Sequence, residues 1–187
     1  MRTIVVLVSL LIAGCTALSV LTPRPTDQLL IAVEITETAF SGPVHGKSGF
    51  FLYLDDTLGG PIVTAYEFRG GRVVDRTGGG SYESDEFLRA MDDIRFESFD
   101  YDAEIAEAAA EITRKEKEGA ERVLPPFVLD GSEYKIEVRY RGSVVRLQKW
   151  NPGAEIDFFA SHSTKIAKLK AVIDLAARYY GRSKFGV

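Results

Sequence analysis

The chain has 187 residues and a formal net charge of −4, from 23 Lys and Arg against 27 Asp and Glu. A mildly acidic chain does not offer the basic surface that non-specific nucleic-acid binding requires, so this class of partner is excluded. Hydrophobic residues make up 45% of the sequence, enough for one core of ordinary size, and the single cysteine has no second cysteine with which to form an internal disulfide.

The first fifteen residues form a segment of their own. Met1, Arg2 and Thr3 give a positively charged start, and an almost wholly apolar run over residues 4–12 follows. This run is shorter than the roughly 20 apolar residues that a bilayer-spanning helix needs, and its length is typical of the apolar region of a secretory signal peptide. The simpler alternative is an ordinary signal peptide or N-terminal anchor in which the cysteine has no role.

The end of this run resembles the signal of bacterial lipoproteins. Their lipobox consists of an aliphatic residue, a small residue, Gly or Ala, and Cys; within Leu11-Ile12-Ala13-Gly14-Cys15 the last four residues match it. The resemblance implies that the thiol of Cys15 is alkylated with a lipid, that the chain is cleaved before it, and that the new amino terminus is acylated. Each buried CH₂ of such chains contributes about 0.8 kcal/mol, so several chains would hold the protein at a membrane.

Three parts are therefore expected: a signal peptide over residues 1–14, a lipidated N-terminus and tether over 15–28, and a single domain over 29–187. The domain would be anchored to the cell membrane on its periplasmic or other extracytoplasmic side. Thr16 is not the Asp that commonly retains such lipoproteins at the inner membrane, so the resemblance implies the outer membrane in a cell that has two. A lipidated Cys15 leaves no thiol for nucleophilic, metal-binding or redox chemistry.

The first half of the domain is predicted to consist of strands. An apolar start followed by alternation predicts a strand over residues 30–38, and a short aromatic run predicts another over 50–54. Residues 62–69 and 72–77 flank a Gly-Gly pair, which predicts a hairpin.

Two helices are expected next. Ser84 is expected to cap a helix that runs to about Ile94, with Asp85 and Glu86 suiting its positive end. The second helix is expected over residues 102–118, where strong helix formers follow one another. The small side chains on its apolar face predict close or only peripheral packing; they are Ile105, Ala108, Ala109 and Ile112.

The clearest signal lies between Glu133 and Trp150. A two-residue turn at Arg141-Gly142 pairs residues whose numbers sum to 283, which places apolar residues opposite one another on one face. These pairs are Val138 with Val145 and Ile136 with Leu147. The other face pairs Glu137 with Arg146, Lys135 with Gln148, Arg139 with Val144, and Glu133 with Trp150.

The sequence also predicts a turn at Asn151-Pro152-Gly153 and a final helix over residues 162–180. The order of strands, two helices, hairpin and helix predicts an α+β fold. We expect an antiparallel sheet of about five to six strands with helices packed on one face, that is, a two-layer sandwich.

The motifs that bring catalytic or cofactor chemistry are incomplete. The stretch SGPVHGKSG is similar to a phosphate loop, but Ser41 occupies the position of the first glycine and a strand follows, so no nucleotide site is expected. The chain has only two histidines, His45 on a loop and His162, which we interpret as solvated in the first turn of the last helix; multi-His metal sites are thus excluded. No metal, cofactor or catalytic residue is predicted.

One group of acids is better explained by structure than by metal binding. Asp100, Asp102 and Glu104 alternate like the start of a calcium loop, but Ile105 stands where that loop needs glycine. We interpret these acids as helix-capping residues.

A candidate partner-binding face remains on the hairpin. Arg139, Arg146 and Trp150 belong to the side opposite the apolar pairs, and arginine near tryptophan is typical of binding hot spots. Glu137 is expected to neutralise Arg146 in part, which would leave Arg139 and the indole available. In the alternative interpretation, Trp150 folds over the sheet edge and becomes a satellite core residue.

These observations favour a membrane-anchored extracytoplasmic lipoprotein, as a non-catalytic binding or envelope accessory domain with an envelope protein or glycan partner. Two other classes stay open. One is a hydrolase of an envelope substrate that uses carboxylates such as Asp55, Asp56 or Asp130, although nothing in the sequence pairs them. The other is a structural spacer or surface antigen.

Overall fold

The computed structural model describes residues 28–36, 47–55, 60–70, 72–78, 81–125 and 132–181. In chain order, its elements are β1 (Gln28–Thr36), β2 (Lys47–Asp55), β3 (Ile62–Arg69), β4 (Arg72–Gly78), α2 (Ser81–Ile94), α3 (Tyr101–Lys117), β5 (Glu133–Tyr140), β6 (Ser143–Trp150), α4 (Pro152–Ala160) and α5 (Thr164–Tyr179).

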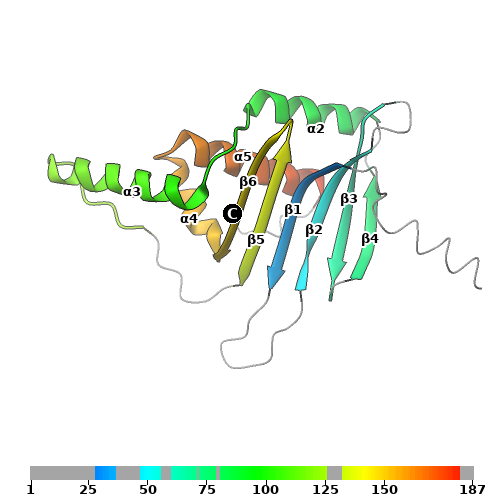
Figure 1. Cartoon of the computed structure of the whole chain (residues 1–187), viewed down its shortest axis with the longest axis horizontal. Coiled ribbons are helices and arrows are strands. Elements are labelled where there is room, and N and C mark those ends of the chain that lie inside the picture. The colour runs from blue at the N-terminus through cyan, green and yellow to red at the C-terminus, as the bar shows by residue number, and fades with distance from the viewer. Residues whose placement is uncertain are drawn as a thin grey trace, which may run out of the picture.

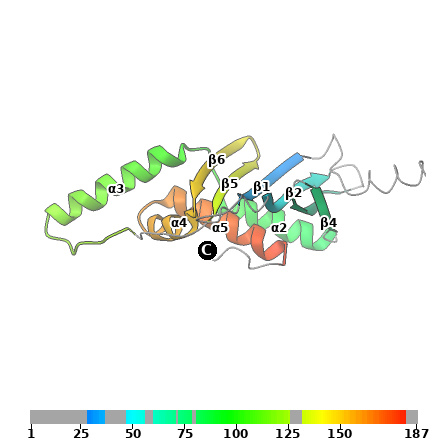
Figure 2. The same cartoon turned by 90° about the horizontal axis from the view of Figure 1, so that it is seen from below.

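The strands form one antiparallel sheet in the order β4-β3-β2-β1-β5-β6 (Figure 1). Figure 2 shows α2, α4 and α5 on one side of this sheet, while α3 extends past the edge that β6 forms. The predicted α+β class, with an antiparallel sheet and helices packed against it, is confirmed.

The core lies between the sheet and its helices. Alternate residues of the central strands point into it and are almost completely buried, as are Phe87 and Met91 of α2. Apolar residues at helical spacing on α5 cover the same space, as the sequence pattern predicts. The buried strand residues include Ile31, Val33, Leu52, Val63, Ile136 and Val138, and those of α5 are Ile166, Leu169, Val172, Ile173 and Ala176.

The predicted hairpin is confirmed residue by residue. β5 and β6 pair in the expected register, from Glu133 opposite Trp150 to Tyr140 opposite Ser143. Arg141 and Gly142 form the turn with φ values of 46° and 84°. Positive φ at both positions is the geometry of the tight hairpin turn whose twist matches that of the flanking strands.

Gly49 allows β1, β2 and β3 to come together. A Cβ atom at this position would lie 1.9 Å from the carbonyl oxygen of Val33, so only glycine fits. The ring of Phe68, which is paired with Gly49 across the strands, lies next to the same point and stacks on Phe51 with ring centroids 4.7 Å apart. β2 therefore begins at Lys47, three residues before the predicted start, because the last part of the glycine-rich stretch is strand.

The start of α2 differs from the prediction. The helix begins at Ser81, so Ser84 is not its cap but a buried residue in its first turns. Its Oγ accepts a hydrogen bond from the backbone N–H of Val63 at 2.9 Å, and the hydroxyl of Tyr179 donates to the carbonyl of Val63 at 2.8 Å. The pairing of β3 with β4 begins at Thr64, so β4 offers no backbone partner to Val63. The side chains of Ser84 and Tyr179 supply those two hydrogen bonds instead.

The predicted turn at Asn151-Pro152-Gly153 is wrong in part, because α4 begins there. Asn151 adopts a left-handed conformation with φ of 43°, and Pro152 then occupies the first turn of the helix. Proline is favoured at this position because its missing N–H has no helical partner there in any case. His162 consequently lies in the exposed turn between α4 and α5, before Ser163, whose side chain caps α5 by accepting from the backbone N–H of Ile166.

α3 forms close to the predicted bounds. The Asp100 carboxylate caps it by accepting a hydrogen bond from the backbone N–H of Ala103, as expected for an acid in this position. Only Tyr101 and Ala108 of this helix are buried, so its packing is peripheral.

Candidate functional site

The side chains of β5 and β6 that point away from the helices form one continuous surface. Their neighbours in sequence, among them Val138 and Val145, are buried in the core, and strand alternation directs the intervening residues to the opposite side. We call this surface the hairpin face. It consists of Glu133, Lys135, Glu137 and Arg139 of β5 and Val144, Arg146, Gln148 and Trp150 of β6.

Two arginines of the hairpin face share one carboxylate. Oε1 of Glu137 accepts a hydrogen bond from Nε of Arg139 and another, at 3.2 Å, from a terminal nitrogen of Arg146. Partial burial alone would raise the pKa of the Glu137 carboxyl, but hydrogen bonds from Arg146 and Arg139 outweigh it and hold that pKa below its usual range. The expected contact between Glu137 and Arg146 is confirmed, but the expectation that Arg139 would be left available is wrong in part, because Arg139 also binds Glu137.

Trp150 keeps much of its surface in contact with solvent. The residue is 47% exposed, and in the described part of the chain its indole makes no hydrogen bond or ring contact. A satellite core residue would be covered over most of its area. The structure therefore brings together Arg139, Arg146 and Trp150 on one exposed face, with Trp150 at its far end.

The hairpin face carries a net positive charge. Lys135 is exposed and forms no ion pair within the described residues, and the Glu133 carboxylate accepts a hydrogen bond from the Gln148 amide at 2.7 Å. Three cationic side chains, Lys135, Arg139 and Arg146, thus stand against two carboxylates, Glu133 and Glu137, which leaves a charge of +1 (3 − 2) on a chain whose formal charge is −4.

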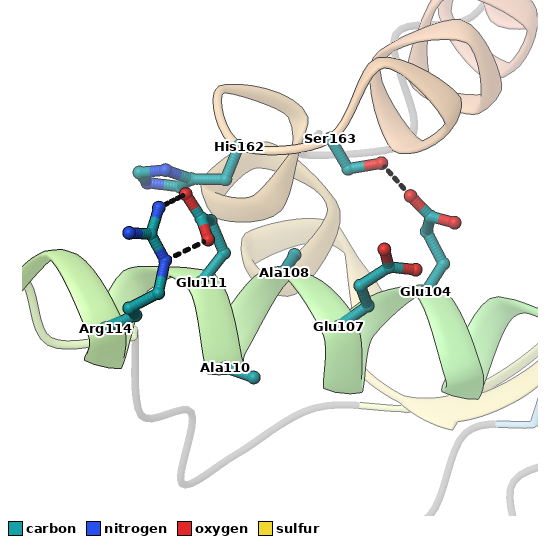
Figure 3. A pocket seen from close by; sticks show the side chains of 8 residues that line it. All are labelled: Glu104, Glu107, Ala108, Ala110, Glu111, Arg114, His162 and Ser163. Carbon is teal, nitrogen blue, oxygen red and sulfur yellow. Dashed lines mark hydrogen bonds and ion pairs between the residues drawn. The ribbon is translucent and has the colours of Figure 1, made fainter.

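A second candidate lies between α3 and the turn that joins α4 to α5. Figure 3 shows the glutamates of one face of α3 in a row, with His162 and Ser163 across from them. The hollow has a volume of about 410 Å³, and we call it the acidic groove. Its lining consists of Glu104, Glu107, Ala108, Ala110, Glu111, Arg114, His162 and Ser163.

The carboxylates of the acidic groove are largely engaged by the protein itself. Glu104 accepts hydrogen bonds from Lys165 and Ser163, both at 2.6 Å, and these two bonds lower its pKa. Hydrogen bonding by Arg114 likewise lowers the pKa of Glu111. Both groups are held in the ionised form, whereas a general acid must carry its proton at the working pH. This electrostatic setting does not favour an acid–base pair.

Metal binding and the carboxylate hydrolase hypothesis gain no support from the described residues. Within them, no three His, Cys, Asp or Glu side chains are grouped so that they could hold a metal ion. Asp55 is buried at the end of β2. The other candidate residues lie outside the part of the chain that the structure describes; they are Asp56, Asp130, His45 and Cys15.

The sequence pattern predicts only one wall of the acidic groove. Glu104, Glu107 and Glu111 are spaced three and four residues apart, which places them on one face of a helix. The opposite wall comes from residues 162–163, some fifty positions later, and no local pattern connects the two. The hairpin face, in contrast, is readable from strand alternation alone.

Comparison with known proteins identifies no relative, since no family model, curated protein or solved structure matches the chain. None of the helices within the described ranges is both long and apolar enough to cross a membrane.

Proposed function

We propose that this protein is a lipid-anchored extracytoplasmic domain that binds an envelope partner through the hairpin face. The observation that carries the binding role is that an exposed Trp150 and two arginines share one surface, and within the described residues no helix covers it (Figure 2). Tryptophan supplies apolar area and arginine supplies directional donors, and both are enriched where binding energy is concentrated. The lipobox-like segment that ends at Cys15 supports the anchor.

The position of the anchor supports a partner in the envelope rather than the lipid surface. The proposed tether joins the domain at Gln28, where β1 begins, and β1 ends at Thr36, opposite Glu133. Glu133 pairs in turn with Trp150. Nine strand residues span about 30 Å, so Trp150 lies at the end of the sheet that is remote from the attachment point.

The anchor is tested by Cys15→Ser, which removes the thiol that would take the lipid. We expect the variant to remain uncleaved or to become soluble, with no lipid detected on it by mass spectrometry. Thr16→Ala leaves the four lipobox positions intact and should be processed and lipidated like the parent chain. Membrane retention of the parent chain without attached lipid would contradict the anchor. Membrane fractionation would then test the outer-membrane assignment.

The binding role is tested by capturing the partner from the protein's own membrane and identifying it by mass spectrometry. The double variant Arg139→Ala, Trp150→Ala should abolish the capture while its melting temperature falls only modestly, because both side chains are exposed. Arg89→Ala on α2 removes an exposed arginine away from the hairpin face and should leave the capture unchanged. Unchanged capture by the double variant, or collapse of its fold, would contradict the proposal.

A further inference from the structure

The cations of the hairpin face retain donors that no protein group uses. Arg139 contacts Glu137 through Nε, and Arg146 contacts it through one terminal nitrogen, while the two side chains are 48% and 61% exposed. The remaining N–H groups of both guanidinium groups point to no other partner among the described residues, and the ammonium group of Lys135 is likewise unpaired there. All three groups are available to carboxylates from outside, the acceptors that such donors bind most strongly.

These groups form a regular strip along the hairpin. Successive rows of the hairpin face contain Arg139 and Val144, then Glu137 and Arg146, then Lys135 and Gln148, then Glu133 and Trp150. A cation therefore occurs in each of the first three rows, alternating between the two strands, and the indole occupies the fourth. Rows two residues apart are about 7 Å from one another, so the strip is about 20 Å long.

An extended peptide has the same repeat. Its alternate side chains lie on one side and are also about 7 Å apart, so acidic residues at alternate positions match the three cations in turn. The carboxylates of the hairpin face cannot satisfy all three cations, because Glu137 is shared by Arg139 and Arg146 and Glu133 is engaged by Gln148. Charge complementarity therefore points to a ligand with a short run of carboxylates.

The rest of the protein limits how large that anion can be. The chain as a whole has a formal charge of −4, whereas the hairpin face has a net charge of +1. A long polyanion would be repelled by the net negative charge of the chain, whereas a short acidic segment needs to contact only the hairpin face.

Building on the proposed function, we propose that the partner is a protein that presents an extended acidic segment to the hairpin face. Its alternate carboxylates pair with Arg139, Arg146 and Lys135, and an apolar side chain at one end covers Trp150. The guanidinium groups fix the register of the segment, and the indole contributes the desolvated apolar contact.

The test uses Trp150 as its own reporter, because it is the only tryptophan in the chain. The full chain, carrying its lipid in detergent micelles, is titrated with a nine-residue peptide that has glutamates at alternate positions and a leucine at one end. We expect the tryptophan emission to move to shorter wavelength and the affinity to fall with added salt. The same peptide with glutamine in place of each glutamate should bind at least tenfold more weakly.

Three variants and a control test which side chains of the hairpin face bind the peptide. Arg146→Gln and Lys135→Gln should each weaken binding several-fold, and Arg89→Gln should leave it unchanged. Glu137→Gln should strengthen binding several-fold, because it releases both arginines from their shared carboxylate. Melting temperatures establish that each variant is folded. Equal binding of the glutamate and glutamine peptides, or weaker binding by Glu137→Gln, would overturn the inference.

A parallel titration with a carboxylated oligosaccharide, an oligogalacturonate, separates this inference from the proposed function. Tighter binding of the oligosaccharide, with the same dependence on Arg146 and Lys135, would overturn the peptide assignment and leave the hairpin face as a binding surface. Capture of the membrane partner that does not depend on Arg139 and Trp150 would instead overturn the proposed function itself.

Discussion

The β5–β6 hairpin and α3 are neighbours that are held in the fold in different ways. They meet where Lys149 of β6 forms an ion pair with Asp102 at 2.5 Å and lies over the ring of Tyr101. The hairpin buries every second residue of its central part in the core, whereas α3 buries only Tyr101 and Ala108. Both segments have strong local sequence signals, yet the hairpin contributes more fully buried side chains to the core than α3 does.

Polar contacts take the place of burial along α3. The Tyr101 hydroxyl donates to Glu155 at 2.9 Å, and Glu104 binds Ser163 and Lys165. Hollows lie on both sides of the helix: the acidic groove, and a second hollow of about 210 Å³ beside Ile112, residues 122–125 and Phe158. A local pattern thus predicts that an element forms, while burial decides how much the element contributes to stability.

The largest effect is expected from a charge placed on the buried side of the hairpin. Val138 is fully buried, so Val138→Asp introduces a carboxyl group without a partner at a cost of several kcal/mol, enough to unfold the domain. Arg139→Asp places the same group on the exposed side of the same strand and should cost less than about 1 kcal/mol. Thermal melts followed by circular dichroism measure both. Similar decreases in melting temperature in the two variants would show that the two faces of the hairpin do not differ in burial as described.

A smaller contrast is expected between apolar truncations in the two regions. Leu147→Ala removes a buried side chain from β6 and should lower the free energy of unfolding by about 2–3 kcal/mol. Ile112→Ala removes a partly buried side chain from α3 and should lower it by about 1 kcal/mol, since solvent already reaches the site. Urea unfolding of both variants gives the two values. A larger loss for Ile112→Ala would show that α3 contributes at least as much to stability through its apolar side as the hairpin does.

The smallest effect concerns the polar attachment of α3. The pKa of Glu104 is lowered in the folded protein by hydrogen bonds from Lys165 and Ser163, so its ionised form stabilises the fold. This contribution is fully present above the ordinary carboxyl pKa, about 4.3, and is lost as the pH falls through the lower folded value. Glu104→Gln should therefore cost about 1 kcal/mol at pH 7, a figure reduced by the exposure of Lys165, and almost nothing near pH 2.

Glu111→Gln separates the attachment of α3 from an ion pair within α3 and should cost less than Glu104→Gln at pH 7, because Glu111 is exposed. Glu111 pairs with Arg114 and Lys115 of its own helix, so it does not attach α3 to the domain. Free energies of unfolding, measured from pH 7 down to pH 2, should converge for the parent chain and Glu104→Gln. A constant difference over that range would show that the Glu104 carboxylate is not the source of the effect.

Local chemistry explains why the hairpin could be predicted in full. Residues that alternate in polarity have only one register in which the apolar side faces the core, and Arg141-Gly142 adopts the positive φ values that this register needs. The same alternation placed Arg139, Arg146 and Trp150 on one face. The apolar stripe of α5 was equally readable, because its period of about 3.6 residues is a property of one segment.

Tertiary contacts decided what the local pattern left open. Asn151-Pro152-Gly153 is compatible with a turn or with a helix start, and Ile156 and Phe159 favour the helix only because the core offers space to bury them. Ser84 has the chemistry of a helix cap, but its hydroxyl oxygen instead accepts a hydrogen bond from the backbone N–H of Val63, which has no partner in β4.

Sequence patterns predicted the elements whose stabilising pattern lies within one segment: the hairpin with its two faces, the stripe of α5 and the α+β order. Which groups from distant segments meet depends on the packing of the whole domain. Examples are Glu104 with Ser163, and Ser84 and Tyr179 with Val63. The physical reason is that alternation and helical period act between residues a few positions apart, whereas hydrogen bonds to buried backbone and ion pairs between elements exist only once the core has brought those segments together.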